Sequence, residues 1–338
     1  MGWLRQLLDF MVPEERLELS SPRGAGDFES ANFWYNAKDF RQLTNKCVMS
    51  MGALALLFSD PAHAAQPAAY LTYVLHTESR LDSPVMYASP EAWAQTRHNI
   101  VAWARLVEAE GQALDLFFSP DYMEAEREWG RDYAQETGGT NLFLWLDRLP
   151  HVEVGAHVDE ADGQWLYADA QEILLGFGVR DHGIVGGTFC IPGPAGYTEF
   201  WSGQTSSSGW TWRPTIIHGL ASPGHVCDLR DSGVWRPSLD SAWMNDPSGP
   251  LVAVGGHRNT TETIMGELGA CDPARLNTFS VQIFQAALSE PDFLAGRRRE
   301  AGMWAGRQEV AWATLTEVAA VWRAQYLEEP SLVVRGAW

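Results

Sequence analysis

Strand-like and helical segments alternate along most of this chain, and this alternation limits its fold more than any other feature. In the first half, strand-like segments are expected at 70–75, 114–118, 152–156 and 183–189. The helical segments expected between them lie at 90–111, with proline at its start and glycine at its end, around 141–149, and at 167–176. Strands that alternate with helices in this way build a mostly parallel sheet.

The second half predicts more strands and one long terminal helix. The strands are expected at 213–217, 233–236, 251–254 and 278–284, and their ends carry His218, Arg236, His257 and Gln285. The helix is expected at 310–326, where apolar residues recur at helical spacing. Seven or eight such strands predict an α/β fold of the irregular (β/α)7-8 barrel type, with a doubly wound open sheet as the alternative. No G-x-G-x-x-G motif follows the first strand, which argues against a dinucleotide site.

The first 65 residues predict a targeting segment rather than a folded domain. Two basic residues precede an apolar run at 48–58, and small residues follow at 62–65. This order predicts a signal peptide at 47–65, which is too short to span a membrane, with a small buried helix as the alternative. Residues 1–46 are then expected to result from a start site placed too early and to be disordered. The remaining 66–338 would form a single (β/α) barrel domain, secreted or periplasmic, with no integral membrane segment in the mature chain.

Composition narrows the classes of partner. The formal net charge of -19 and the pI near 4.8 argue against nucleic acid and against an anionic membrane surface, because both need basic patches. The 16 tryptophans favour a carbohydrate partner without establishing one, since tryptophan is also a common core residue. Export permits disulfide bonds, but only Cys190, Cys227 and Cys271 remain after the signal, so at least one stays unpaired.

Two of the expected strands end in the same polar pattern, a histidine followed two residues later by a carboxylate. His76 and Glu78 follow the first strand, and His157 and Asp159 follow the third. Residues i and i+2 of a strand point to the same face, so each pair shares a face. Active sites of barrels lie at the carboxyl ends of the strands, where both pairs occur. Imidazole and carboxylate suit Zn²⁺ or another divalent metal, whereas the alternative is a pair of polar strand ends that only contact solvent.

These residues resemble the polysaccharide deacetylase superfamily. The resemblance lies in the polar end of the first strand, the sequence Val154-Gly155-Ala156-His157 that closes the third, and the terminal helix around 314–318. It implies an irregular (β/α)₇ barrel and a divalent metal, often zinc, that serves to hydrolyse N- or O-acetyl groups on sugars. In that family an aspartate and an H-x-x-x-H motif hold the metal, and a second acidic residue acts as the base.

The resemblance places a metal on this chain with an altered ligand set. His157 stands where the first family histidine would stand, but Ala161 occupies the place of the second. His76 and Glu78 stand where the family has two aspartates. The expected metal ligands are therefore His76, Glu78, His157 and Asp159. Glu160 is the expected base or a spare ligand, and Glu78 is the second candidate for the base.

Further polar residues at strand ends and in one loop are expected to line a substrate pocket: Asp121, His218, His225, Asp228 and His257. The predicted function is a secreted metal-dependent hydrolase that removes acyl groups from a carbohydrate or related polymer. One alternative is a metal-free glycoside hydrolase that uses Glu78 and Glu160, whose separation would set the stereochemical course. Another is a carbohydrate-binding barrel without catalysis. The absence of a G-x-S-x-G motif argues against a serine hydrolase.

Overall fold

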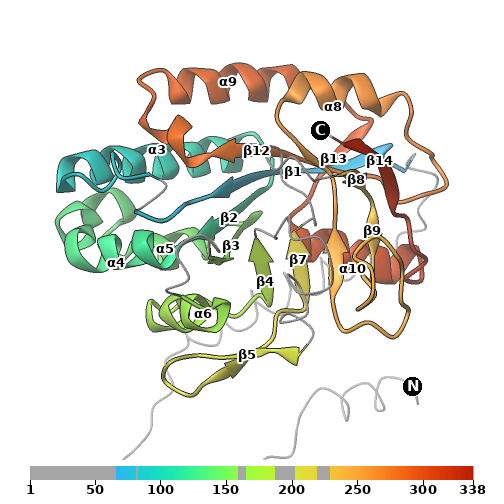
Figure 1. The fold of residues 1–338 in the computed structure, drawn as a ribbon. Helices are drawn as coiled ribbons and strands as arrows, with labels where there is room; N and C mark the ends of the chain where they lie inside the picture. Colours follow the sequence, from blue (N-terminus) through green and yellow to red (C-terminus); the bar gives the residue numbers. More distant parts are fainter. Residues whose placement is uncertain (1–65, 81–82, 159–164, 187–201, 219–228, 338) are drawn as a thin grey trace, which may run out of the picture. The chain divides into compact units, whose positions relative to one another are not determined.

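A mostly parallel sheet forms the centre of the fold in the computed structural model, which describes residues 66–80, 83–158, 165–186, 202–218 and 229–337 (Figure 1). The parallel strands are β1 (Ala69–His76), β2 (Leu114–Phe118), β3 (Val152–His157), β4 (Ile184–Gly186), β7 (Ile216–His218), β10 (Val252–Val254), β11 (His257–Arg258) and β12 (Thr278–Phe284). Their order in the sheet is β11-β12-β1-β2-β3-β4-β7-β10. Two further strands join the sheet: β9 (Val234–Trp235), antiparallel to β10, and β13 (Val310–Trp312), parallel to β1.

The sheet closes into a barrel because the first and last of its parallel strands, β11 and β10, are consecutive parts of one segment. β10 pairs with β7, β11 pairs with β12, and only Gly255 and Gly256 separate β10 from β11. At this bend the Ser280 N–H donates to the Gly256 carbonyl at 2.8 Å. Gly256 has a φ of +116°, and a Cβ atom there would lie 2.3 Å from the carbonyl oxygen of Thr278. Only glycine therefore allows the bend that closes the ring.

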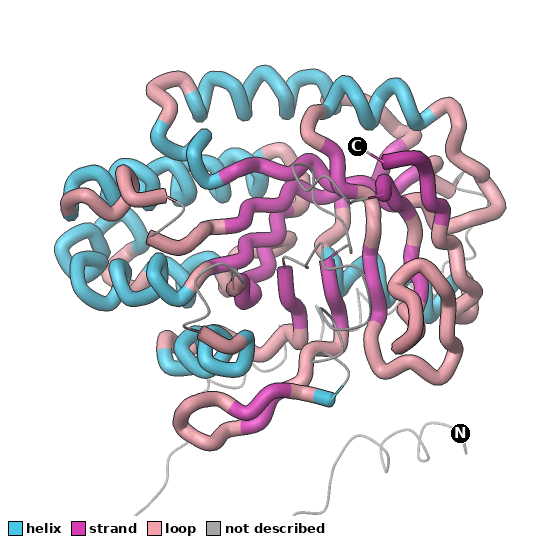
Figure 2. The backbone as a smooth tube through the Cα atoms, in the orientation of Figure 1, coloured by secondary structure: helices cyan, strands magenta, loops and turns pink. Residues whose placement is uncertain are grey.

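Helices follow most of the parallel strands, and most of them cover the outside of the barrel (Figure 2). They are α3 (Pro90–Ala109), α4 (Pro120–Trp129), the 3₁₀ helix η1 (Gly130–Thr137), α5 (Leu142–Leu146), α6 (Tyr167–Gly176), α8 (Thr261–Leu268), the 3₁₀ helix η3 (Gln285–Ser289), α9 (Phe293–Trp304) and α10 (Leu315–Gln325). Two small antiparallel pairs complete the described structure: β5 (Gln204–Thr205) with β6 (Thr211–Trp212), and β8 (Leu229–Ser232) with β14 (Val333–Ala337). No helix within these ranges has both the length and the apolar character needed to cross a membrane.

Alternation along the strands divides the apolar residues between two cores. Odd-numbered residues of β1, such as Leu71 and Tyr73, pack outward against α3 and its neighbours. Even-numbered residues, such as Tyr70 and Val74, point inward and pack with residues of α10, including Trp322. The largest fully buried side chains in these two cores include four tryptophans: Trp93, Trp103, Trp235 and Trp322. These four tryptophans fill the protein interior and do not form a platform for sugar rings.

Two adjacent carboxylates form a polar layer inside the barrel near the amino ends of its strands. Asp115 of β2 and Glu153 of β3 are register neighbours and are both buried. The N–H of Leu315 donates to Asp115 Oδ1 at 3.2 Å, and the hydroxyl of Thr314 donates to Glu153 Oε1 at 2.9 Å. The carboxylates thereby bind the start of α10, where free N–H groups and the helix dipole favour negative charge.

Burial raises the pKa of Asp115 well above its ordinary value, and the adjacent carboxylate of Glu153 raises it further. A hydrogen bond from the Thr72 hydroxyl to Asp115 Oδ2, 2.6 Å long, opposes this shift. Burial beside a second carboxylate therefore favours the protonated form of Asp115.

The structure confirms most of the predicted elements and corrects others. The predicted barrel is confirmed, and the described part of the chain supplies seven parallel positions once β10 and β11 are counted as one strand. The segment predicted as a helix at 310–326 is instead a strand, β13, followed by the shorter α10. The segment 233–236 was predicted as a further barrel strand, but β9 runs antiparallel to its neighbour. Ser119, which directly follows β2, caps α4, because its side chain accepts from the N–H of Tyr122.

Some predictions fall outside the described residues. They include the disordered start at 1–46, the signal peptide at 47–65, and the cysteines Cys190 and Cys227. Cys271 is half-buried and forms no disulfide bond with any described residue. The described residues from 66 onward belong to one compact unit.

Replacing Gly256 with alanine is expected to destabilise the barrel. The added Cβ would meet the Thr278 carbonyl, and alanine would be strained at this positive φ, so the free energy of unfolding should fall by about 2 kcal/mol or more. The matched control is Gly266→Ala in α8, where a Cβ atom meets nothing within 4 Å and alanine favours the helix by about 0.5–1 kcal/mol. Urea denaturation of both variants measures the difference. Equal effects of the two substitutions would contradict the assigned role of the bend.

Asp115→Asn is expected to change how stability depends on pH. Folded Asp115 keeps its proton to a higher pH than unfolded Asp115, so its favourable contribution is complete below the unfolded pKa, about 3.9, and is lost as pH rises toward the folded pKa. Across that window the parent should lose up to about 1.4 kcal/mol per pH unit relative to the variant, which cannot titrate there. Urea midpoints of both proteins from pH 4 to pH 8 provide the measurement. A stability difference that stays constant over this range would rule out the raised pKa.

Candidate metal centre

The carboxyl end of β1 presents the first two candidate ligands at the mouth of the barrel. His76 is the last residue of β1, and its side chain is buried. Its inward direction follows from the alternation that also turns Tyr70 and Val74 into the barrel interior. The chain then stays bound to β2, because the Thr77 N–H donates to the Phe117 carbonyl at 2.9 Å. Glu78 follows directly and leaves the barrel wall with a side chain that is one quarter exposed.

Three hydrogen bonds hold the backbone of Glu78 in place. Its N–H donates to Gln285 Oε1 at 2.5 Å, so the residue is fixed to the end of β12. Its carbonyl accepts from the hydroxyls of Tyr87 and Ser119, each at 2.9 Å. The carboxylate therefore extends from a well-anchored position, although Glu78 lies outside regular structure.

The carboxyl end of β3 presents the third candidate ligand. His157 Nδ1 lies 3.1 Å from the carbonyl oxygen of Gly186 on β4. A carbonyl oxygen can only accept, so Nδ1 carries a proton and Nε2 is the atom directed to the mouth. His157 Nε2 lies 3.0 Å from Glu78 Oε2. A histidine whose other nitrogen donates to a backbone carbonyl is the usual arrangement of a metal-binding imidazole.

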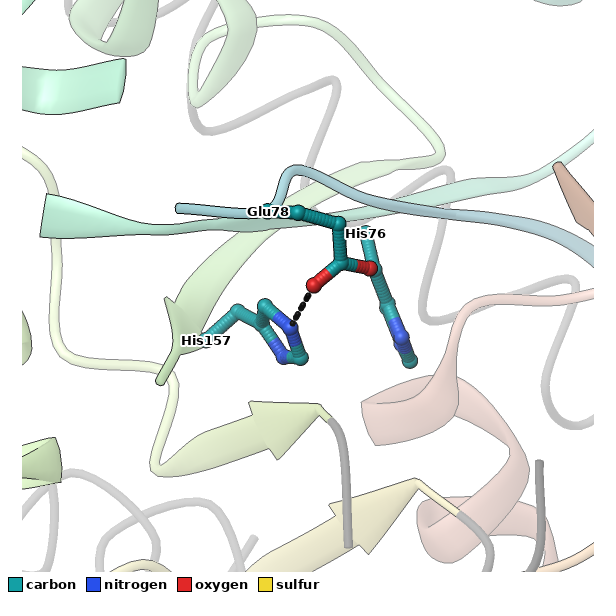
Figure 3. A group of neighbouring side chains, drawn as sticks. All are labelled: His76, Glu78 and His157. Atoms are coloured by element: carbon teal, nitrogen blue, oxygen red, sulfur yellow. Dashed lines mark hydrogen bonds and ion pairs between the residues drawn. The ribbon is translucent and has the colours of Figure 1, made fainter. Parts of the chain in front are cut away.

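His76, Glu78 and His157 come together as one group (Figure 3). One potential ligand atom from each residue lies within 4.8 Å of the others. The rings of His76 and His157 are stacked, with centroids 4.7 Å apart and planes at 22°. Two imidazoles and one carboxylate fit a zinc-type ion, and this set leaves a coordination position open, as in catalytic zinc sites. The chemistry of the donors and their convergence therefore fit a divalent metal.

Two more histidines adjoin this group inside the mouth. His218 ends β7 and donates to or accepts from the hydroxyl of Ser280 through Nε2, at 3.0 Å. His257 begins β11, and its Nδ1 lies 2.8 Å from Gln282 Oε1. The centroids of these two rings are 3.8 Å apart. The centroid of the His76 ring lies 5.9 Å from that of His218 and 6.2 Å from that of His257.

Burial lowers the pKa of His218 well below its ordinary value, and the neighbouring rings of His257 and His76 lower it further. His218 is therefore neutral at physiological pH. Its Nδ1 atom has no hydrogen-bond partner among the described residues, and the same holds for the buried Nε2 of Gln285. Two buried polar atoms without partners at one mouth are suited to meet a bound molecule, since such atoms are otherwise costly to bury.

The structure brings together three of the four predicted metal ligands. Asp159, the fourth, and Glu160, the predicted base, lie outside the described residues, as do His225 and Asp228. His218 and His257 were predicted to line the pocket, and they stand next to His76.

Asp121 was also predicted to line the pocket. Its Oδ2 accepts from the backbone N–H of Arg80 at 2.7 Å, two residues after Glu78. In the structure this carboxylate binds the segment that carries a candidate ligand, rather than joining the group of ligands.

Sequence reasoning assigned no role to the residues that support the mouth from β12 and the segment after it. Ser280 and Gln282 contact the two outer histidines, and Gln285 holds Glu78. A sequence pattern could have identified them, because polar residues alternate with apolar ones along 278–284 and so mark one face of a strand.

A cleft of about 300 Å³ lies between the segment that follows Glu78 and the segment that follows Gln285. It is lined by Ser83, Pro84, Val85, Met86, Ala286 and Ser289. None of the candidate metal ligands lines it, and its apolar character distinguishes it from the histidine-rich mouth.

Comparisons with known proteins gave structural likeness without sequence relatives. No protein-family model matches the chain, and no curated protein matches it in sequence. Similar solved structures include a proposed polysaccharide deacetylase from Mycobacterium smegmatis, with a TM-score of 0.47 and 10% identity over 82% of this chain and 97% of that one. They also include Puue allantoinase, with a TM-score of 0.46 and 13% identity over 79% of this chain and 95% of that one. A further proposed polysaccharide deacetylase, from Pseudomonas aeruginosa, has a TM-score of 0.43 and 12% identity over 77% of this chain and 92% of that one. At such scores and identities, the likenesses do not establish a shared chemistry.

Proposed function

We propose that this chain is a metal-dependent hydrolase that removes acyl groups from a carbohydrate or related polymer. The observation that carries the proposal is the convergence of His76, Glu78 and His157, whose ligand atoms lie within 4.8 Å of one another at the mouth of the barrel. These three residues would hold the metal, which we propose to be zinc. Asp159 is proposed as a fourth ligand.

A divalent metal at this position supplies a Lewis acid for the hydrolysis of an ester or amide carbonyl. The chain itself supplies the orientation. The Gly186 carbonyl fixes the tautomer of His157, and Gln285 fixes the backbone of Glu78. Glu160 is proposed to take the proton from the attacking water.

The inner mouth provides the substrate contacts in this proposal. His218 Nδ1 and Gln285 Nε2 are buried and have no partner among the described residues, so a hydroxyl or carbonyl of a substrate would satisfy them. Neutral His218 and the one-quarter-exposed carboxylate of Glu78 give the pocket hydrogen-bonding groups of the kind that sugars use. We also propose that the protein is secreted or periplasmic, on the strength of the signal-like segment at 47–65.

The geometry weakens the metal-free alternative. A glycoside hydrolase of this design would need Glu78 as one of two working carboxylates. Glu78 is instead directed at His157 Nε2, 3.0 Å away, and lies beside a second imidazole. This arrangement suits a ligand better than an acid that protonates a leaving group.

His157→Ala is expected to abolish both zinc binding and activity, because the loss of one of three or four ligands leaves an incomplete shell. The readouts are zinc content of the purified full chain by mass spectrometry and acetate release from acetylated xylan and acetylated chitooligosaccharides. The matched control is His98→Ala in α3, whose ring is half-exposed and contacts Glu136 at 2.9 Å. It should leave both quantities unchanged.

Glu160→Gln separates the role of base from that of ligand. It should keep the zinc and lose about 10²–10⁴-fold in rate. A parent that holds no zinc, or a His157→Ala variant that holds as much as the parent, would refute the metal centre. A parent that holds zinc and binds the polymers but releases no acetate would refute the hydrolase and favour a binding protein.

A further inference from the structure

One buried aromatic ring lies beneath the histidines of the mouth. Phe117 of β2 is the register neighbour of His76 on one side and of Gly155 on the other, and it is fully buried. Its ring is 5.3 Å from the ring of His76 in an edge-to-face arrangement at 78°. It is 5.7 Å from the ring of His218 and nearly parallel to it, at 8°. The ring thus contacts two of the mouth histidines in two different geometries.

Two glycines on the next two strands provide the space for this ring. A Cβ atom on Gly155 would lie 2.9 Å from the Phe117 ring, and one on Gly186 would lie 2.2 Å from it. Any other residue at either position would displace the ring. Gly186 also accepts the hydrogen bond from His157 Nδ1. The same residue therefore makes room for Phe117 and orients a candidate ligand.

The His76 ring is enclosed by these contacts. Phe117 meets it on one side, and the His157 ring stacks on it at 4.7 Å. Ligand rings that are held by packing pay less ordering entropy on binding, and residues behind a metal ligand typically change metal affinity 10–100-fold when altered.

We infer that Phe117 is a positioning residue of this centre. It holds the ring of His76, and through the stacked pair the ring of His157, in the orientation that presents both to one cation. The inference rests on the proposed function, because it assigns a role toward the metal of that site.

Phe118 offers a matched control for the test. It is the next residue, is equally buried, and points to the opposite face, where its ring contacts Tyr122 and Phe143 at 5.3 and 4.8 Å. Phe117→Leu and Phe118→Leu remove similar amounts of buried aromatic surface from the two faces of one strand. Both are expected to lower the urea midpoint. A purely structural role would make the two variants alike in every other respect.

Zinc affinity, measured by competition with a chromogenic chelator at constant pH, separates the two roles. Phe117→Leu should weaken zinc binding by about 10–100-fold, whereas Phe118→Leu should stay within about threefold of the parent. If Phe117→Leu does not fold, Phe117→Met is measured in the same way, since methionine has a similar volume and a flexible side chain that can fill the space without a ring. Equal zinc affinities for the parent and the Phe117 variant would overturn the inference and leave the proposed function intact.

A second readout does not require the metal. In the zinc-free protein, nitrogen-15 spectra of the histidine rings should show shifts at His76 and His218 in Phe117→Leu and none at these rings in Phe118→Leu. Unchanged resonances at both rings would overturn the positioning role. A parent that binds no zinc would instead refute the proposed function, and the inference with it, so the two failures are distinguishable.

Discussion

The parallel register of β1, β2 and β3 is the constraint on which the candidate site depends. It sets His76 level with Phe117 and Phe117 level with Gly155, so that His157 lies two residues further along, on the same inward face. A slip of one residue would turn every one of these side chains to the outside of the barrel. The register is itself held by the outward residues of the same strands, which pack against the helices, and by the closing bend at Gly256, which joins the two ends of the sheet.

The kinds of side chain inside the barrel change along its axis. Residues that stabilise the fold therefore lie apart from those that form the candidate metal centre. Near the amino ends of the strands, Asp115 and Glu153 bind the start of α10 and close the interior. Apolar residues and the Phe117 ring fill the middle. Four buried histidines, His76, His157, His218 and His257, meet at the carboxyl ends. The carboxyl groups of the lower layer accept hydrogen bonds from the start of α10. In the upper layer, His218 Nδ1 and Gln285 Nε2 have no hydrogen-bond partner among the described residues.

Much of this arrangement is predictable from local patterns. The alternation along β1 and β3 and the repeated His-x-carboxylate motif predict that His76, Glu78 and His157 lie at one end of the barrel. Side-chain parity is a local property, and alternating strands and helices indicate a parallel sheet. What the sequence does not reveal depends on contacts distant in the chain. Phe117 reads as an ordinary core residue until Gly155 and Gly186 are seen beside it. The strand β13 reads as helix because its apolar residues continue the period of α10, and only pairing with β1 makes it a strand. The antiparallel β9 likewise reflects its pairing with β10 rather than its composition.

The central claim is that His76, Glu78 and His157 bind one divalent metal ion. Anomalous diffraction from crystals of the protein grown with zinc, recorded on both sides of the zinc absorption edge, tests it most directly. The account predicts one strong anomalous peak about 2 Å from a nitrogen of each histidine and from an oxygen of Glu78. The absence of a peak among these three side chains, with zinc present at other positions in the same crystal, would contradict it.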